Sequence, residues 1–177
     1  DVQHTGCWVD LGNVTTFMGA KVLVVGLGDI GREFACRAGA LGATVTGIKR
    51  TPGAAPDYVD ALYTMERLDE CLAQADVVFM SLPGTPATQG LFDRARIGKM
   101  KPGSILINVG RGNAVELNAL CDAIAEGRLL GAAVDVTDPE PLPPEHRAWH
   151  TEDLLITPHI SGGFHLKLTH DRIAAIA

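Results

Sequence analysis

Residues 21–50 constrain the fold of this chain more than any other stretch of its sequence. An apolar run over residues 22–25, which has the length of a strand buried on both faces, leads into glycines in the order G-x-G-x-x-G. A second strand-like run over residues 43–48 closes the stretch. Between the two lies a helical pattern whose apolar face is formed by Ile30, Phe34, Ala35, Ala38 and Leu41. Strand, glycine turn, helix and strand within about 30 residues predict a dinucleotide-binding βαβ unit.

Each glycine of the motif has a separate steric task in such a unit. Gly26 allows the tight turn off the strand, Gly28 lets a pyrophosphate approach the backbone, and Gly31 lets the helix pack closely. The helix N-terminus adds free N–H groups and a partial positive charge. Asp29 would repel a pyrophosphate, so we expect it to point away while Arg32 offsets part of its charge. The alternative is a turn whose glycines serve packing alone. The predicted cofactor contacts here are Gly26, Gly28, Asp29, Ile30 and Gly31.

Strand-like runs alternate with helical patterns along the rest of the chain. Further strands are predicted over residues 77–80, 104–108, 130–136 and 154–156, and helices over residues 63–75, 91–100, 114–127 and 164–177. This alternation predicts an α/β protein with a Rossmann-type, doubly wound parallel sheet in the order 3-2-1-4-5-6, with residues 22–25 central. We expect a leader or arm over residues 1–18, a dinucleotide-binding domain over residues 19–163, and a helix over residues 164–177.

Composition narrows the class of protein. With 177 residues, 46% hydrophobic and 20% charged, the chain is long enough for one globular domain with a sizeable core. A net charge of −6 without a basic run argues against nucleic acid as a partner, and no apolar run approaches the roughly 18 residues of a membrane span. The four cysteines are scattered, which predicts neither a metal site nor disulfides and favours a cytoplasmic protein. Cys36 and Cys121 lie in helical patterns and are predicted to be small buried hydrophobes.

Polar residues follow several of the predicted strands, where ligands of such sheets bind. Arg111 lies between glycines after one strand, and its guanidinium can grip a carboxylate with two parallel hydrogen bonds. His159 follows a proline after the last strand and can give or take a proton near neutral pH, and Glu140 could hold and orient that imidazole. Asp135 follows a third strand. A lone arginine in a turn is more often a surface charge and a lone histidine is more often structural, but their joint placement favours a catalytic site.

Three runs then carry a resemblance to a known family. MKPGSILINVGRG at residues 100–112, GAAVDVTDPEPLP at residues 131–143 and LLITPHISGG at residues 154–163 resemble motifs of the D-isomer-specific 2-hydroxyacid dehydrogenases, in the same order and spacing. The similarity covers about residues 18–163. It implies that Arg111 binds the substrate carboxylate, that His159 is the general acid/base, and that Glu140 is its carboxylate partner. It also implies that Asp135 contacts the nicotinamide carboxamide.

The resemblance implies further cofactor contacts at the ends of later strands. They are Leu82, Pro83, Val109, Gly110, Arg111, Asp135, His159, Ser161 and Gly162.

The chain departs from the family at the end of its second strand. NAD-preferring members carry an acid there that accepts from the ribose hydroxyls, whereas this chain has Lys49, Arg50 and Thr51. Cations and a hydroxyl suit a 2′-phosphate, so we expect these residues to contact the cofactor and NADP to be preferred over NAD. The alternative is a solvated basic turn. The family also has a second lobe, largely absent from this chain, which we expect to carry much of the substrate specificity.

The leading hypothesis is an oxidoreductase that transfers a hydride between NAD(P)H and the 2-carbon of a 2-oxo or 2-hydroxy acid, in the D-isomer series. One alternative is a non-catalytic nucleotide-sensing protein that resembles the family's corepressors. Another is a methyltransferase that uses the same fold for S-adenosylmethionine, against which the full glycine motif argues. Because related proteins dimerise through this domain, we expect a homodimer in which the leader reaches a partner subunit.

Overall fold

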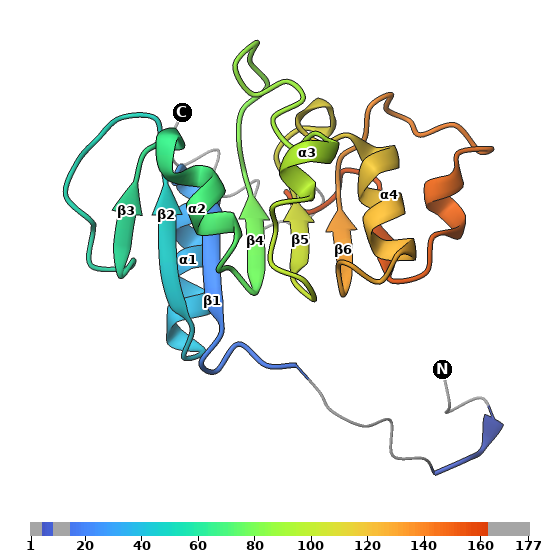
Figure 1. The fold of residues 1–177 in the computed structure, drawn as a ribbon, viewed down its shortest axis with the longest axis horizontal. Helices are drawn as coiled ribbons and strands as arrows, with labels where there is room; N and C mark the ends of the chain where they lie inside the picture. The colour runs from blue at the N-terminus through green and yellow to red at the C-terminus, as the bar shows by residue number, and fades with distance from the viewer. Residues whose placement is uncertain (1–4, 9–14, 163–177) are drawn as a thin grey trace, which may run out of the picture.

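A computed structural model, which describes residues 5–8 and 15–162, shows one sheet with helices on both faces (Figure 1). The sheet has seven strands in the order β3-β2-β1-β4-β5-β6-β7, and every pair of neighbouring strands is parallel. The strands are β1 (Lys21–Val25), β2 (Thr44–Ile48), β3 (Ala61–Tyr63), β4 (Val77–Met80), β5 (Ile105–Asn108), β6 (Gly131–Val134) and β7 (Leu154–Ile156). The predicted α/β class and doubly wound parallel sheet are confirmed.

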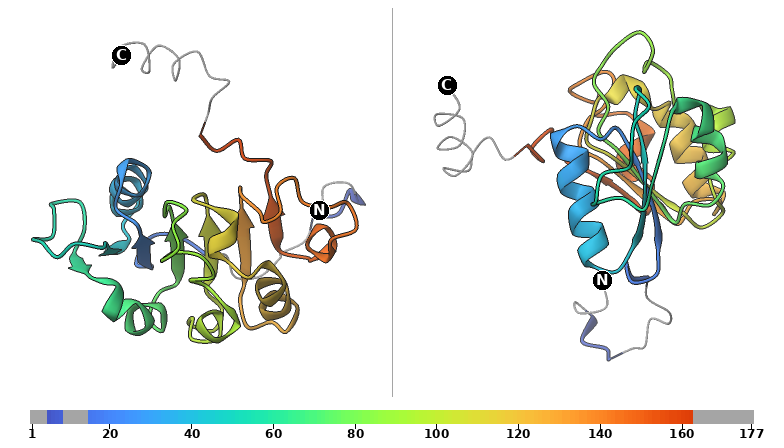
Figure 2. Two further views of the ribbon diagram at one scale, coloured as in Figure 1. Left: turned by 90° about the horizontal axis from the view of Figure 1, so that it is seen from above. Right: turned by 90° about the vertical axis from the view of Figure 1, so that its left-hand side faces the viewer.

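The helices divide between the two faces of the sheet. Figure 2 shows α1 on one face, with α2, α3 and α4 on the other. The α-helices are α1 (Asp29–Ala40), α2 (Leu68–Leu72), α3 (Arg94–Ile97) and α4 (Leu117–Ala125), and the 3-10 helices include η2 (Met65–Arg67), η3 (Gly112–Ala114) and η4 (Arg147–His150). Among residues 5–8 and 15–162, no helix is long and apolar enough to cross a membrane.

The predicted strand order needs one correction. The six predicted strands did not include β3, and the order 3-2-1-4-5-6 would then put residues 77–80 at the sheet edge. In the structure residues 77–80 form β4, which pairs with β1, and β3 takes the edge beside β2. With β3 counted, the predicted order holds and β7 extends it. β3 has three half-buried residues, too few to show a period of two in the sequence.

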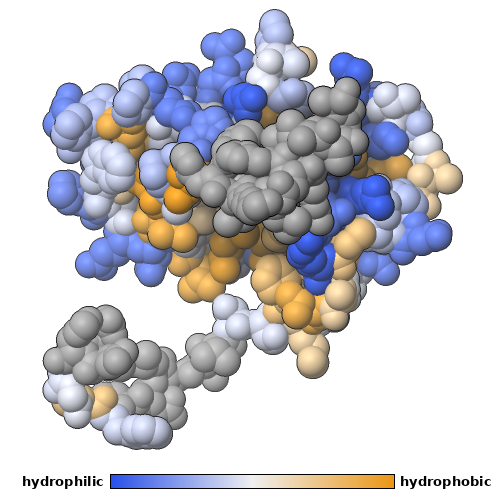
Figure 3. Space-filling view, turned by 180° about the vertical axis from the view of Figure 1, so that it is seen from behind, coloured by the Kyte–Doolittle hydropathy of each residue, from blue (hydrophilic) through white to orange (hydrophobic). Residues whose placement is uncertain are grey.

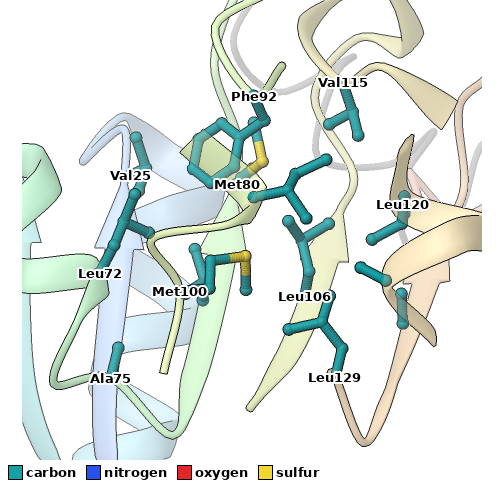
Figure 4. Packing of buried hydrophobic residues seen from close by; sticks show 14 of the residues in the cluster. Val25, Leu72, Ala75, Met80, Phe92, Met100, Leu106, Val115, Leu120 and Leu129 are labelled. Atoms are coloured by element: carbon teal, nitrogen blue, oxygen red, sulfur yellow. The ribbon is translucent and has the colours of Figure 1, made fainter. Parts of the chain in front are cut away.

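The core lies in two clusters because the side chains of β1 alternate between the faces. Leu23 and Val25 belong to the cluster beneath α2, α3 and α4, part of which is shown in Figure 4. Val22 and Val24 belong to the cluster beneath α1. All four are buried, as expected for the central strand of a parallel sheet. Because all neighbouring strands are parallel, their carboxyl ends lie along one edge of the sheet, between the two clusters.

The predicted apolar face of α1 is partly wrong. Ala35 and Ala38 are buried, but Ile30 is 55% and Leu41 is 58% exposed. The helix packs through small residues together with Phe34, whose ring stacks on Phe79, and the apolar side chains at its two ends stay outside. Cys36 is exposed, contrary to its predicted burial, whereas Cys121 is buried as predicted.

The predicted helix over residues 164–177 lies outside the described residues, as does most of the leader over residues 1–18. The domain boundaries stay predictions. Within the described part, the predicted helices over residues 63–75, 91–100 and 114–127 are present but shorter, as η2 with α2, α3, and α4.

Candidate cofactor and catalytic site

The glycine turn, residues 26–31, joins the carboxyl end of β1 to α1. Gly26 has a φ of 100°, a left-handed backbone that favours glycine, and its carbonyl oxygen accepts a hydrogen bond of 2.8 Å from Ser81 Oγ. A Cβ at Gly31 would overlap that same oxygen, whereas a Cβ at Gly28 would meet nothing within 4 Å. The turn is thus closed beside Gly31 and open beside Gly28, which is the shape that a pyrophosphate approaching the backbone requires.

The N-terminus of α1 begins on the open side of this turn. Gly28 is its N-cap residue, no described side chain caps it, and the first helical hydrogen bond runs from Arg32 N to Gly28 O over 2.8 Å. Asp29 and Ile30 are exposed in this first turn. The guanidinium of Arg32 lies over the ring of Tyr58, 5.9 Å from its centroid. An uncapped helix start with free N–H groups suits an anion such as a pyrophosphate.

The basic residues predicted to select the cofactor follow β2 directly. Lys49, Arg50 and Thr51 are all exposed. Lys49 N donates to Tyr63 O over 3.0 Å, and Ile48 O accepts from Gly26 N over 2.9 Å. The basic segment therefore begins next to Ile48, which contacts the glycine turn. In such folds the residues at this position contact the ribose of a bound dinucleotide.

Arg111 lies in a turn, residues 108–112, that is wedged between the backbones of two neighbouring loops. A Cβ at Gly110 would lie 2.7 Å from both Leu82 N and Leu82 O, and a Cβ at Gly112 would overlap the carbonyl group of Thr137. Both glycines are therefore required by close backbone approach. The backbone of Arg111 is fixed between the loop that follows β4 and the loop that follows β6.

Asn108 fixes the same turn from inside. This residue is 1% exposed. Its Oδ1 accepts a hydrogen bond of 3.0 Å from Gly110 N, and its Nδ2 donates one of 3.0 Å to Arg111 O. One buried neutral side chain thus braces two successive residues of the turn.

The side chain of Arg111 is exposed and runs along the loop after β4. Its Nη1 donates to Gly110 O over 2.7 Å. A Cβ at Gly84 would lie 3.3 Å from Arg111 Cγ, so a glycine there leaves room for the arginine stem. Because a guanidinium has five N–H donors, this contact leaves donors for a planar anionic ligand.

Asp135, directly after β6, is a buried hydrogen-bonding centre with 5% exposure. Its Oδ1 accepts from Thr157 Oγ1 over 2.5 Å and from Ile160 N over 2.9 Å, and its Oδ2 accepts from Ser161 N over 2.9 Å and from Ser161 Oγ over 2.6 Å. Burial raises the pKa of Asp135, but these hydrogen bonds outweigh it, so its pKa lies below the ordinary value of 3.8. The carboxylate is therefore charged at neutral pH although it is buried.

His159 and Glu140 meet beside this centre. His159 Nδ1 lies 2.6 Å from Glu140 Oε1, and both side chains are about two-fifths exposed, at 41% and 43%. His159 has a φ of 53°, which is uncommon for any residue except glycine. A cavity of about 370 Å³ borders the pair, with Leu142 and Trp149 among its walls. The two residues lie 19 positions apart in the sequence, and the structure brings them into contact as predicted.

The remaining predicted contacts lie on the same edge of the sheet. Val109 N donates to Met80 O over 3.0 Å, which extends the pairing of β4 and β5 by one residue. Pro83 O accepts from Thr88 Oγ1 over 2.7 Å, within the loop after β4. Gly162 is exposed at the end of the described residues.

Three polar residues of this region were not among the predicted site residues: Ser81, Asn108 and Thr157. Asn108 carries a signal that was available, because an asparagine two residues before a glycine at a strand end is typical of an Asx turn. Ser81 and Thr157 bond to Gly26 and Asp135, which are 55 and 22 residues away, and no local pattern announces such pairs.

The residues that could hold a cofactor and the residues that could act on a substrate lie at different strand ends on the same edge of the sheet. The glycine turn and the start of α1 can hold a pyrophosphate, and the residues after β2 can reach a ribose. The turns after β5 and β7 present a guanidinium and an imidazole paired with a carboxylate. The open backbone at Gly28, beside the uncapped start of α1, shows that these residues fit a dinucleotide.

Comparisons with known proteins agree with this geometry. Residues 1–161 match the model of "D-isomer specific 2-hydroxyacid dehydrogenase, NAD binding domain". The D-3-phosphoglycerate dehydrogenase of Mycobacterium leprae is 38% identical over 82% of this chain, which covers 27% of that protein.

Solved structures also match. The phosphoglycerate dehydrogenase of Lactobacillus plantarum superposes with a TM-score of 0.84 at 39% identity, over 91% of this chain and 52% of that one. A D-isomer specific 2-hydroxyacid dehydrogenase of Xanthobacter autotrophicus Py2, in complex with NADPH and MES, has a TM-score of 0.80 at 35% identity, over 90% of this chain and 65% of that one. The chain thus spans about half the length of the Lactobacillus protein and about a quarter of the mycobacterial one. The chain belongs to the D-isomer specific 2-hydroxyacid dehydrogenase family, whose NAD binding domain it matches.

Proposed function

We propose that this chain is the cofactor domain of an NAD(P)-dependent oxidoreductase that interconverts a 2-oxo acid and a D-2-hydroxy acid. The observation that carries the proposal is the 2.6 Å contact of Glu140 with His159 on the sheet edge that also carries the glycine turn and Arg111. The substrate carboxylate binds the guanidinium of Arg111, as a planar bidentate pair. The bound nicotinamide supplies the hydride.

His159 and Glu140 handle the proton. During reduction, negative charge develops on the substrate carbonyl oxygen, and the His159 imidazolium donates a proton to it. Glu140 fixes the orientation of the imidazole through Nδ1, which leaves Nε2 for the substrate. During oxidation the same imidazole accepts the proton from the hydroxyl.

Three substitutions in the protein that contains this chain test these roles with a panel of 2-oxo acids. His159→Ala should lower kcat by on the order of 10²–10⁴, the usual contribution of general acid catalysis. Glu140→Gln should lower kcat with little change in KM, because the imidazole loses the carboxylate that orients it through Nδ1. Arg111→Lys keeps the charge but loses the planar fork, so it should mainly raise KM.

Near-normal turnover of His159→Ala would overturn the acid/base role. If the unmodified protein binds NAD(P)H but turns over no 2-oxo acid of the panel, the result would favour a non-catalytic nucleotide-sensing protein over an oxidoreductase. The exposed His150, on η4, gives a matched control, since His150→Ala should leave the rate unchanged.

We further propose that the cofactor is NADP rather than NAD. Support comes from Lys49, Arg50 and Thr51 after β2 and from the NADPH complex of the Xanthobacter relative. Titration with both reduced cofactors should give tighter binding of NADPH. Lys49→Asp should reverse the order, and Lys49→Gln should weaken NADPH alone. Tighter binding of NADH by the unmodified protein would contradict the preference.

The proposed assembly is a homodimer. Figure 3 shows apolar side chains gathered on the lower half of the face that carries α1. A groove of about 410 Å³ lies there, lined in part by Met18, Ile105, Ile107 and Leu130. Trp8 of the leader is fully exposed. Sedimentation equilibrium should give twice the monomer mass, and a monomer at micromolar concentration would contradict this part of the proposal.

A further inference from the structure

We propose that Asp135 is a positioning residue, which holds the turn of His159 (residues 157–161) in its working conformation and acts on the reaction through that turn. The inference rests on the proposed function, in which His159 is the acid/base. It goes beyond the contact with the nicotinamide carboxamide that the family resemblance implied for Asp135.

The hydrogen bonds of Asp135 converge on one short segment. Its side chain accepts from Thr157, Ile160 and Ser161, which flank His159 on both sides. Its backbone carbonyl accepts from His159 N over 2.8 Å. One residue of β6's carboxyl end thus fixes the whole turn that follows β7, including the residue that carries the imidazole.

The turn needs such a clamp because its backbone is unfavourable. His159 has a φ of 53°, and a left-handed conformation costs an L-residue roughly 1–2 kcal/mol. Pro158 before it removes one N–H donor, so the local backbone has fewer ways to hold itself. Hydrogen bonds to a charged acceptor are about twice as strong as neutral ones and can offset this cost.

The same bonds fill the acceptor capacity of the carboxylate. An ionised carboxylate offers about four lone-pair positions. Each oxygen of Asp135 already accepts two hydrogen bonds from within the chain, and the group is 5% exposed. Within the described part of the chain, the residues of this turn are therefore the main partners of the carboxylate.

Thr157 allows a test that leaves Asp135 itself unchanged. Thr157→Val keeps the side-chain shape and removes only the hydroxyl that donates to Asp135 Oδ1 over 2.5 Å. Thr157→Ser retains the hydroxyl and is the matched control. Asp135→Asn should have the larger effect, because an amide has one oxygen acceptor where the carboxylate has two. All three are made in the protein that contains this chain.

Two readouts are followed. The first is kcat at saturating cofactor, beside the Kd of NADPH from fluorescence titration and the melting temperature. The second, without cofactor or substrate, is hydrogen exchange of the Ile160 and Ser161 amides. Since a misplacement of about 1 Å can cost on the order of 10² in rate, we expect kcat to fall about tenfold in Thr157→Val and about 100-fold in Asp135→Asn. In Thr157→Val the Kd of NADPH should stay within about twofold and amide exchange should accelerate about tenfold, and Thr157→Ser should restore both kcat and exchange.

Unchanged kcat and unchanged amide exchange in Thr157→Val would overturn the clamp. Weaker NADPH binding in Asp135→Asn, with normal amide exchange in both variants, would also overturn it, because Asp135 would then act through the cofactor alone. His159→Ala separates this inference from the proposed function. If His159→Ala abolishes turnover and Thr157→Val does not alter it, the clamp alone fails. If His159→Ala is active, the proposed function fails, and the exchange measurement still decides the clamp.

Discussion

Two turns on the same edge of the sheet carry the proposed catalytic side chains, and they are held in different ways. The Arg111 turn, residues 108–112, is fixed by steric contact of Gly110 and Gly112 with neighbouring backbones and by the neutral amide of Asn108. The His159 turn is fixed by the buried charge of Asp135, which belongs to another strand end. The first device is local and uncharged, and the second is long-range and ionic.

The two turns should therefore respond to different perturbations. A turn wedged between backbones cannot accept a larger side chain but is indifferent to pH. A turn held by one carboxylate tolerates change around it but depends on that charge. The following experiments separate the two, in order of the expected effect.

The largest effect is expected from Gly112→Ala. Its Cβ would overlap the carbonyl group of Thr137, and a backbone group cannot rotate away as a flexible side chain can. We expect the free energy of unfolding in urea to fall by about 3 kcal/mol. Gly53→Ala is the control, because a Cβ there would meet nothing within 4 Å. Equal stability of the two variants would show that the turn is not wedged.

Asn108→Asp should have the next largest effect. The new oxygen would face Arg111 O, where Nδ2 now donates, in a site that is 1% exposed. A buried unsatisfied polar group costs about 1–3 kcal/mol, and we expect the substrate KM to rise by on the order of tenfold as Arg111 shifts. Ser104→Ala, just before the same strand, should cost almost nothing, since the buried Ser104 hydroxyl has no partner among the described residues. An unchanged KM in Asn108→Asp would show that Asn108 does not hold Arg111 in place.

Acid should release the His159 turn before the Arg111 turn. The pKa of Asp135 in the folded protein lies below its ordinary value of 3.8, so its stabilising contribution is present above that value and is lost as the pH falls through the folded pKa. Exchange of the Ser161 amide should therefore accelerate below about pH 4, while that of Gly110, bonded to a neutral amide, should not.

The carboxylates of Asp69, Asp76 and Asp122 also have lowered pKa values, so global stability falls in the same range. Asp135→Asn isolates the contribution of Asp135. In this variant only the amides of residues 157–161 should lose the steep dependence of their exchange on acid. Parallel acceleration of the Ser161 and Gly110 amides would contradict the contrast between the turns.

The smallest effect is expected from Gly84→Ala. A Cβ would lie 3.3 Å from Arg111 Cγ, a tight contact that an exposed, flexible stem can relieve by a small rotation. We expect KM to change by about twofold and the melting temperature to stay constant, in steady-state kinetics and thermal melts. A tenfold rise in KM would mean that Arg111 has less freedom than its exposure suggests.

Features of this protein that have local causes could be predicted from its sequence. A buried strand, the glycine spacing and a helical pattern specify the βαβ unit at residues 21–50, because steric demands on the turn act between residues that are close in the chain. The alternation of later strands and helices gave the parallel sheet, and Arg111 between two glycines marked a turn. The short edge strand β3 was not predicted, because three residues are too few to show the alternation of a strand.

The contacts that hold the Arg111 and His159 turns arise only in the folded protein. Gly110 and Gly112 are required by Leu82 and Thr137, which lie 28 and 25 residues away, and the four donors to the Asp135 carboxylate lie 22 to 26 residues beyond it. The resemblance paired Glu140 with His159, but the left-handed backbone of His159 and its clamp had no sequence signal. Parallel strands bring their carboxyl ends together only after the sheet has formed, so contacts along that edge are properties of the fold and not of any segment.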